Sequence, residues 1–325
     1  MTTEEFDMTG GQITQEGTDN TQQDGFIGTG GGDMSYQPPI PPIPNPLPQG
    51  GIMGLSEEEE KDPNNIVVEI SDTSTPIVIL FGAKTSGKTM TLIRLTQYLQ
   101  QQGYRVIPDP IFRPTRDTHY KRMCRDFQKM CNNKYAADGN DVMSFMLVRV
   151  LDRKGKPICQ LLEAPGEHYF DADDPKRPFP TYINQFLQLR NRRTWLIIVE
   201  KDWGDDTQTR NAYAYRVQNL PPQVSRDKAI FTCHKIDKQV ESFLPNGRPN
   251  KKALFENIKQ QYNGIFTRFV NENPITRLFV KYRFQFVPFS AGVFNKTTNG
   301  AQVYTPSNDM YPSALWKAIL KTVKG

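Results

Sequence analysis

The chain has 325 residues with a formal net charge of +5, a length that fits two average domains or one large domain with a tail. Its 4 cysteines form no CxxC pair and its 3 histidines cannot complete a zinc cluster, so we expect free thiols in a reducing compartment. No apolar run approaches the roughly 18 residues of a membrane span, and the acidic N-terminus lacks the features of a signal peptide. We therefore predict a cytoplasmic protein with no membrane span.

The charge is divided unevenly along the chain. Residues 1–65 hold 12 acidic residues and one basic residue, a net charge of −11, which leaves 39 basic and 23 acidic residues, a net charge of +16, for residues 66–325. Such a basic body attracts polyanions such as nucleotides, nucleic acid or an acidic membrane surface. Excess Lys and Arg is equally common on a plain solvated surface, so the sequence does not decide whether the body binds nucleic acid.

Residues 1–64 are predicted to be a disordered acidic tail, and residues 65–325 a single folded domain. The tail is rich in Gly, Thr, Gln and Asp and poor in large apolar residues. Residues 38–48 are a proline-rich run that favours an extended polyproline helix with overlapping PxxP patterns. This run is either a docking peptide for a protein partner or a stiff spacer, and its composition favours the spacer.

The predicted elements of the body alternate between strands and helices after one early hairpin. In chain order they are strands at 66–70 and 76–81, helices at 88–102 and 115–131, hairpin strands at 144–151 and 157–163, a helix at 182–190, a strand at 195–199, a helix at 207–218, a strand at 229–233, a helix at 251–270, a strand at 282–289 and a closing helix at 311–324. Short apolar strands alternating with helices indicate an α/β fold. We predict a three-layer α/β/α sandwich of the P-loop NTPase type, mostly parallel, with one antiparallel hairpin.

A phosphate-binding loop is predicted between the strand at 76–81 and the helix at 88–102. The sequence there, Gly82-Ala83-Lys84-Thr85-Ser86-Gly87-Lys88-Thr89, fits the pattern G-x-x-x-x-G-K-[ST]. The glycines let successive N–H groups point at one phosphate, and the following helix offers the positive end of its dipole. We expect Lys88 to bind the β- and γ-phosphates and Thr89 to place its hydroxyl on Mg²⁺. The predicted phosphate-binding residues are Gly82, Lys84, Thr85, Ser86, Gly87, Lys88 and Thr89.

Three later segments, each after a predicted strand, resemble in order and position the motifs of Ras-like and translation-factor P-loop GTPases. They are Glu163-Ala164-Pro165-Gly166, His234-Lys235-Ile236-Asp237 and Ser290-Ala291-Gly292. The likeness to a bacterial-type GTPase domain with divergent motifs runs from about residue 77 to residue 325, roughly three-quarters of the chain.

The first segment concerns the metal and the γ-phosphate. The resemblance implies that Glu163 holds Mg²⁺ through a water and that the Gly166 N–H meets the γ-phosphate. Directly after it, Glu167 stands where the family places Gln or His, and His168 follows. Either side chain is a candidate to hold the attacking water, with Lys88 as the third predicted catalytic residue. Because a carboxylate near a triphosphate is electrostatically unfavourable, we expect slow hydrolysis.

The other two segments concern the base. By resemblance, Asp237 accepts two hydrogen bonds from guanine and Lys235 lies along the base plane. His234 stands in place of Asn, and the backbone N–H groups of Ser290 and Ala291 meet the guanine carbonyl. Adenine offers no matching donor pair, so Asp237 predicts GTP as the cofactor, with Mg²⁺, in preference to ATP.

Several positions depart from the family. Glu163 replaces Asp, His234 replaces Asn, Gly292 replaces Lys, and residues 135–143 lack the Thr of the first switch. Further upstream, Thr115 or Thr118 is a candidate for that role, and Arg113 or Arg116 for an internal arginine finger. The alternative, an ordinary loop and helix start, is favoured for this stretch.

These features lead to three functional hypotheses. The first is a regulatory GTPase that meets a protein partner through the N-terminal tail or through the helices inserted at 115–131 and 251–270. The second is a degenerate GTPase-like scaffold, which the departures favour. The third is an ATP-using P-loop NTPase, in which Glu200 and Asp202 would be the metal-binding carboxylates.

Overall fold

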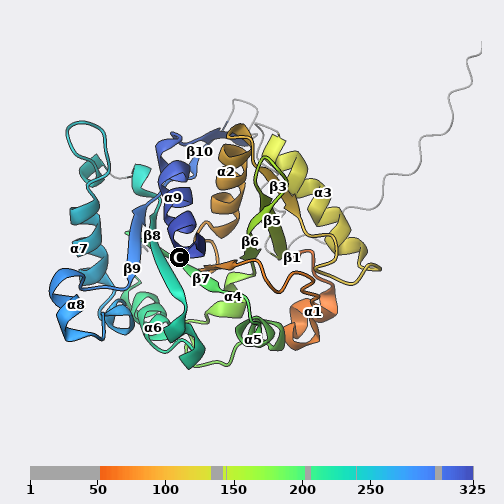
Figure 1. Cartoon of the computed structure of the whole chain (residues 1–325), viewed down its shortest axis with the longest axis horizontal. Helices are drawn as coiled ribbons and strands as arrows, with labels where there is room; N and C mark the ends of the chain where they lie inside the picture. The colour runs from red at the N-terminus through yellow and green to blue at the C-terminus, as the bar shows by residue number, and fades with distance from the viewer. Residues whose placement is uncertain are drawn as a thin grey trace, which may run out of the picture. The chain divides into compact units, whose positions relative to one another are not determined.

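The computed structural model describes residues 52–132, 142–143, 145–201, 206–238, 240–296 and 302–324. A seven-stranded sheet carries the fold, in the order β3-β5-β6-β2-β7-β8-β9 (Figure 1). Its strands are β2 (Ile77–Phe81), β3 (Arg105–Pro108), β5 (Met146–Leu151), β6 (Pro157–Glu163), β7 (Arg193–Glu200), β8 (Lys228–His234) and β9 (Phe284–Pro288). β5 runs antiparallel to β3 and β6, and the other neighbouring pairs are parallel. The predicted sheet, mostly parallel with one antiparallel hairpin, is confirmed.

Helices cover both faces of this sheet, as the predicted three-layer sandwich requires (Figure 1). α2 (Lys88–Gln101) and α9 (Met310–Lys324) pack together on one face, with α3 (Thr118–Asn132) beside α2. α4 (Gly166–Tyr169), α5 (Thr181–Gln188) and α6 (Thr207–Gln218) lie on the other face. α7 (Lys251–Gln261) packs against β9, the edge strand. β2 lies in the middle of the sheet, where all five of its residues, Ile-Val-Ile-Leu-Phe, are buried.

Smaller elements complete the described chain. They are β1 (Ile52–Met53) paired with β4 (Val142–Met143), the helices α1 (Glu57–Lys61) and α8 (Pro274–Phe279), and a hairpin of β10 (Gly292–Lys296) and β11 (Gln302–Pro306). The sequence reasoning missed β3, α8 and the hairpin. All four cysteines are free. Within the described ranges, no helix has the length and apolar character needed to cross a membrane.

Two predicted elements are corrected. Residues 66–70 form no strand: Ile66 is buried and the Glu69 N–H donates to Phe112 O at 2.8 Å, but no ladder follows. The helix predicted for 251–270 ends at Gln261, where the turn-forming pair Asn263-Gly264 follows and the chain turns back toward β9.

Ordered structure begins earlier in the chain than the predicted boundary at residue 65. The sequence placed residues 1–64 in the tail, whereas Leu55 is buried and Glu57–Lys61 is a helix capped by the Ser56 side chain. The proline-rich run at 38–48 lies outside the described residues.

Candidate nucleotide-binding site

The predicted phosphate loop joins the carboxyl end of β2 to the start of α2. Within it Lys88 is 5% exposed, and its ammonium donates to Gly82 O at 3.2 Å and Ala83 O at 3.0 Å. Burial lowers the pKa of Lys88 to about 8, although the charges of Glu163 and Glu167 act in the opposite direction. A buried ammonium held only by carbonyls gains from an anionic partner, as a phosphate would provide.

Glu163 comes from the end of β6, next to β2, and meets this loop. The Thr89 hydroxyl donates to Glu163 Oε1, while the buried Oε2 has no hydrogen-bond partner. Burial raises the pKa of Glu163 to about 7, against the effects of the Thr89 hydrogen bond and of Lys88. A hydroxyl beside a carboxylate with one unpaired buried oxygen fits Mg²⁺, which takes oxygen ligands and is usually held by one or two carboxylates plus phosphates.

Gly166 packs directly against the phosphate loop. A Cβ at this position would lie 2.2 Å from the Lys84 nitrogen and 2.3 Å from the Ala83 carbonyl carbon, so no side chain fits. The next residue, Glu167, lies 3.7 Å from the Lys84 ammonium. Ala83, Lys84 and Glu167 also border a hollow of about 340 Å³ beside the loop.

His168 points elsewhere. Its Nδ1 lies 2.7 Å from the Tyr182 hydroxyl of α5, and the ring is buried. Burial lowers the pKa of His168 to about 4; the charge of Glu167 opposes this shift, and the charges of Arg177 and Lys88 add to it. His168 is therefore engaged with α5, while Glu167 is the side chain that reaches the phosphate loop. The catalytic role of either residue stays a prediction.

His234, at the end of β8, ties the base-recognition segment to the phosphate loop. Its Nε2 lies 2.6 Å from the Thr91 hydroxyl, which itself donates to Gly87 O at 2.8 Å. Through Thr91, the His234 ring is therefore connected to the backbone of Gly87. A Cβ on Gly87 would lie 2.9 Å from His234 Nδ1, so the ring rests on this glycine. His in place of Asn therefore still packs against the loop.

Burial lowers the pKa of His234 to about 3, and the charge of Lys235 adds to the effect. An unfolded His titrates near 6.5, so between pH 6.5 and about pH 3 the unfolded chain binds one proton at His234 that the folded chain does not bind. The free energy of unfolding therefore falls as the pH drops below 6.5. We expect His234→Asn to remove this dependence and to reduce the slope of unfolding free energy against pH by about 1.4 kcal/mol per pH unit. Urea unfolding of both proteins at intervals from pH 7 to pH 4 measures it; equal slopes would contradict the assignment.

Lys235 and Asp237 follow on the same segment. The Lys235 ammonium donates to Glu200 Oε2 at 2.7 Å and to Thr85 O of the phosphate loop at 3.3 Å. Asp237 is exposed in a short 3-10 turn. Glu200, expected as a metal ligand if the chain uses ATP, is instead engaged by Lys235, and its expected companion Asp202 lies outside the described residues.

The third base segment leads into the hairpin that the sequence reasoning missed. Ser290 is buried, and Ala291 O accepts from the Ser307 N–H at 3.0 Å and the Tyr304 hydroxyl at 2.6 Å. Gly292 has φ +133°, and a Cβ there would lie 2.2 Å from Thr305 O. The hairpin thus explains why Gly replaces Lys. All four segments lie at carboxyl ends of parallel strands, where ligands bind in open α/β sheets.

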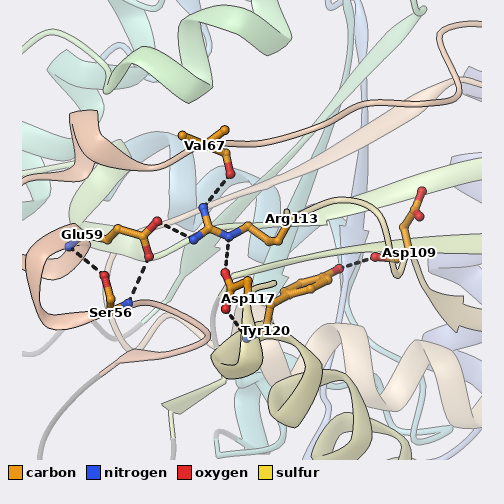
Figure 2. Close-up of polar contacts among 7 residues, drawn as sticks. All are labelled: Ser56, Glu59, Val67, Asp109, Arg113, Asp117 and Tyr120. Carbon is orange, nitrogen blue, oxygen red and sulfur yellow. Dashed lines mark hydrogen bonds and ion pairs between the residues drawn. The ribbon is translucent and has the colours of Figure 1, made fainter. Parts of the chain in front are cut away.

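Arg113 is a buried anchor, which agrees with the favoured interpretation of this stretch and not with the alternative of an arginine finger. Figure 2 shows its guanidinium between the Glu59 carboxylate, Asp117 Oδ2 at 2.9 Å and the Val67 carbonyl at 2.6 Å. The arginine thereby ties the segment around α1 to the start of α3. Arg116 is exposed, and Thr115 and Thr118 are exposed beside it. The stretch is the ordinary loop and helix start that the sequence favoured.

A larger hollow, of about 410 Å³, lies at the opposite end of β7, bordered by Leu187, Arg193 and Arg226. Arg193 is already paired there with Asp227 at 3.1 Å. The candidate site is therefore chosen from the side-chain geometry around Lys88 and not from volume.

No family model and no curated protein matches the chain. Among solved structures it is similar to the Saccharomyces cerevisiae Ski7 GTPase-like domain bound to GDP and inorganic phosphate, with 12% identity and a TM-score of 0.39 over 83% of this chain and 52% of that one. It is also similar to Methanosarcina barkeri Roco2 RocCORdC bound to GDP, with 14% identity and a TM-score of 0.30 over 79% of this chain and 53% of that one. A third similar structure is a putative nucleolar GTP-binding protein 1 of Plasmodium falciparum, with 13% identity and a TM-score of 0.34 over 79% of this chain and 89% of that one. The chain thus spans about half the length of the first two. The fold assignment rests on the sheet order and the loop geometry.

Proposed function

We propose that this chain binds GTP with Mg²⁺ and hydrolyses it slowly, as a regulatory switch in the cytoplasm. The observation that carries the proposal is the contact between Thr89 and Glu163 beside the buried ammonium of Lys88. A hydroxyl, a carboxylate and a lysine from a strand–loop–helix unit and its neighbouring strand are the parts that phosphoryl transfer requires.

Each of the residues around the phosphate loop would bind a different part of the triphosphate and its metal. Lys88 would neutralise phosphate oxygens, and Thr89 and Glu163 would hold Mg²⁺, which supplies further charge neutralisation when bound. Gly166 would offer its backbone N–H to the γ-phosphate. Gly166 packs on Ala83 and Lys84, so the segment that follows β6 lies directly against the phosphate loop.

Guanine is favoured over adenine by the base segment. The Lys235 ammonium donates to Thr85 O of the phosphate loop, and Asp237, two residues further along, is exposed. Asp237 would pair with the two N–H donors on the guanine edge, and adenine would leave it unpaired. Tyr311 of α9 lies close enough for the charge of Asp237 to contribute to the raised pKa of its hydroxyl, after burial.

Glu167 would be the residue that orients the attacking water. It faces the loop through Lys84 at 3.7 Å, whereas the His168 ring is committed to Tyr182. A carboxylate in this role repels the γ-phosphate, and Lys84 would offset part of that repulsion. Slow turnover follows from this arrangement.

The second candidate is a scaffold that binds nucleotide without turning it over. The commitment of His168 to Tyr182 favours it, because the imidazole that follows Gly166 is then removed from the reaction. Single-turnover measurement of GTP hydrolysis by the wild-type chain separates the two candidates. A protein partner, met through the N-terminal tail or through α3 or α7, is proposed for both.

The test of the proposed function is a substitution that changes the preferred base. Asp237→Asn replaces an acceptor by an amide donor, which suits the extra carbonyl of xanthine. We expect GTP affinity to fall at least tenfold and XTP affinity to rise, since each charged hydrogen bond contributes about 1.5–3 kcal/mol. Titration of the full chain with GTP, ATP and XTP in Mg²⁺ measures it, with the exposed Asp173→Asn as the control. A wild type that prefers ATP, or a variant that keeps its preference for GTP, would contradict the proposal.

A further inference from the structure

α8 presents large apolar side chains to solvent. Ile275, Leu278 and Phe279 are 72%, 83% and 84% exposed, and Val280 just after the helix is 53% exposed. Among the other exposed large hydrophobic residues of the described ranges, the highest value is 57%, for Val67. A cluster of this kind within six consecutive residues indicates an interaction surface.

The spacing of these residues gives the helix one apolar face. Ile275, Leu278 and Phe279 stand at i, i+3 and i+4, so their side chains share one side of the helix. The start of the helix is fixed, because Asn273 accepts from the Ile275 N–H through its side chain and from the Arg277 N–H through its carbonyl, both at 2.9 Å.

The segment that carries α8, residues 270–282, has its two ends joined by hydrogen bonds. Val270 and Tyr282 form an antiparallel bridge, and the Asn271 N–H donates to Lys281 O at 2.9 Å. These two contacts join the ends of the segment that carries α8, which lies beside the edge strand β9 in Figure 1. The apolar face is held outward by the fold.

The segment that carries this face is rich in basic residues. Residues 271–283 contain three basic residues, Arg277, Lys281 and Arg283, and one acidic residue, Glu272. Glu272 lies 3.5 Å from Arg283, so its charge is offset locally. Long basic side chains next to exposed apolar ones are suited to the headgroup layer of an anionic bilayer.

We propose that α8 is a peripheral membrane anchor, which inserts Ile275, Leu278 and Phe279 into the interface of an anionic lipid bilayer while Arg277 and Lys281 contact the headgroups. These side chains are 72–84% exposed, so nearly all of their apolar surface faces solvent, which favours a soft apolar medium over a shaped protein pocket. The basic flank selects an anionic surface.

The position of α8 keeps the nucleotide site accessible on the membrane. α8 precedes β9 and lies by its amino end, whereas Ser290 and the other base and phosphate segments follow carboxyl ends of the parallel strands. An anchor at one end of the sheet leaves the opposite end facing the solvent. The inference therefore does not depend on which nucleotide is bound.

The test is sedimentation of the full chain with vesicles of phosphatidylcholine alone or mixed with phosphatidylserine. We expect binding to the mixed vesicles, and a loss of at least about tenfold in affinity for the double variant L278S/F279S, since two apolar side chains no longer insert. The matched control is V67S, which removes an exposed apolar side chain elsewhere and is expected to bind like the wild type. Both replaced side chains lie in solvent, and circular dichroism checks that the variant is folded.

A second readout reports insertion directly. In F279W the new indole should shift its emission to shorter wavelength on mixed vesicles, measured against the wild-type chain. Failure of the wild type to sediment, or unchanged sedimentation of L278S/F279S, would overturn the anchor. A wild-type dimer that L278S/F279S dissociates would also overturn it, because α8 would then be covered by a second copy.

Discussion

Arg113→Ala is expected to lower the free energy of unfolding by about 3–5 kcal/mol, because it leaves two largely buried carboxylates without their cation. The Arg113 side chain is 4% exposed, and its partners Glu59 and Asp117 are 13% and 11% exposed. The guanidinium also lies 5.6 Å from the centre of the Phe145 ring and binds the Val67 carbonyl. Its loss therefore removes contacts to the segment around α1, to Asp117 just before α3 and to Phe145 just before β5. Urea unfolding of both proteins measures the effect.

The control for this prediction is Arg116→Ala. Arg116 is exposed three residues further along the same stretch, and surface substitutions usually change stability by less than about 0.5 kcal/mol. A further variant, E59Q/D117N in the Arg113→Ala background, should recover part of the loss because neutral amides are less costly to bury than unpaired carboxylates. A change below about 1 kcal/mol in Arg113→Ala would show that water replaces the guanidinium at little cost.

The central sheet could be predicted because its strands are short apolar runs that require burial on both faces. β2, β6, β7 and β8 all appear within one or two residues of their expected limits. The failed strand at 66–70 has the same apolar character, with Ile66, Val68 and Ile70 in alternation. Strand formation also needs a hydrogen-bonding neighbour, and a linear sequence does not show whether one exists.

The missed hairpin carried a usable signal. Asn299-Gly300 lies between two short segments with apolar residues, Val293-Phe294 and Val303-Tyr304, and Asn-Gly is a strong hairpin turn signal. The resemblance of Ser290-Ala291-Gly292 to a guanine-binding loop left Gly292 as an unexplained departure from the family's Lys, and its backbone conformation is required by β10 and β11.

The candidate site was predictable where the chemistry depends on spacing along the chain. The phosphate loop is such a case, since strand, loop and helix are contiguous. Contacts between distant residues were not accessible: the pairing of His168 with Tyr182, of Lys235 with Glu200 and of Arg113 with Glu59 depends on the tertiary fold. His168 and Arg113 were candidates for a functional role because a sequence shows which residues are present and not where their side chains are engaged.

Lys88→Met is expected to lower nucleotide affinity by about 100-fold or more while leaving the chain folded. Two charge-assisted contacts to phosphate oxygens, at about 1.5–3 kcal/mol each, account for a loss of this size. Met has a similar length and is apolar, so it occupies the buried position of Lys88 without the desolvation that lowers the pKa of the lysine to about 8. Affinity is measured by titration with a fluorescent GTP analogue, and folding by urea unfolding.

The same variant also tests the buried charge. In the wild type the unfolded chain keeps the Lys88 proton up to pH 10.5, whereas the folded chain releases it near pH 8, so this group makes stability rise with pH between those values. Lys88→Met should lose that rise. The control is Lys84→Met in the same loop, whose side chain is 72% exposed and paired only with Glu167, so we expect a loss of affinity below about tenfold. Equal losses in the two variants would mean that the loop attracts nucleotide by general charge, and the specific role of Lys88 would be rejected.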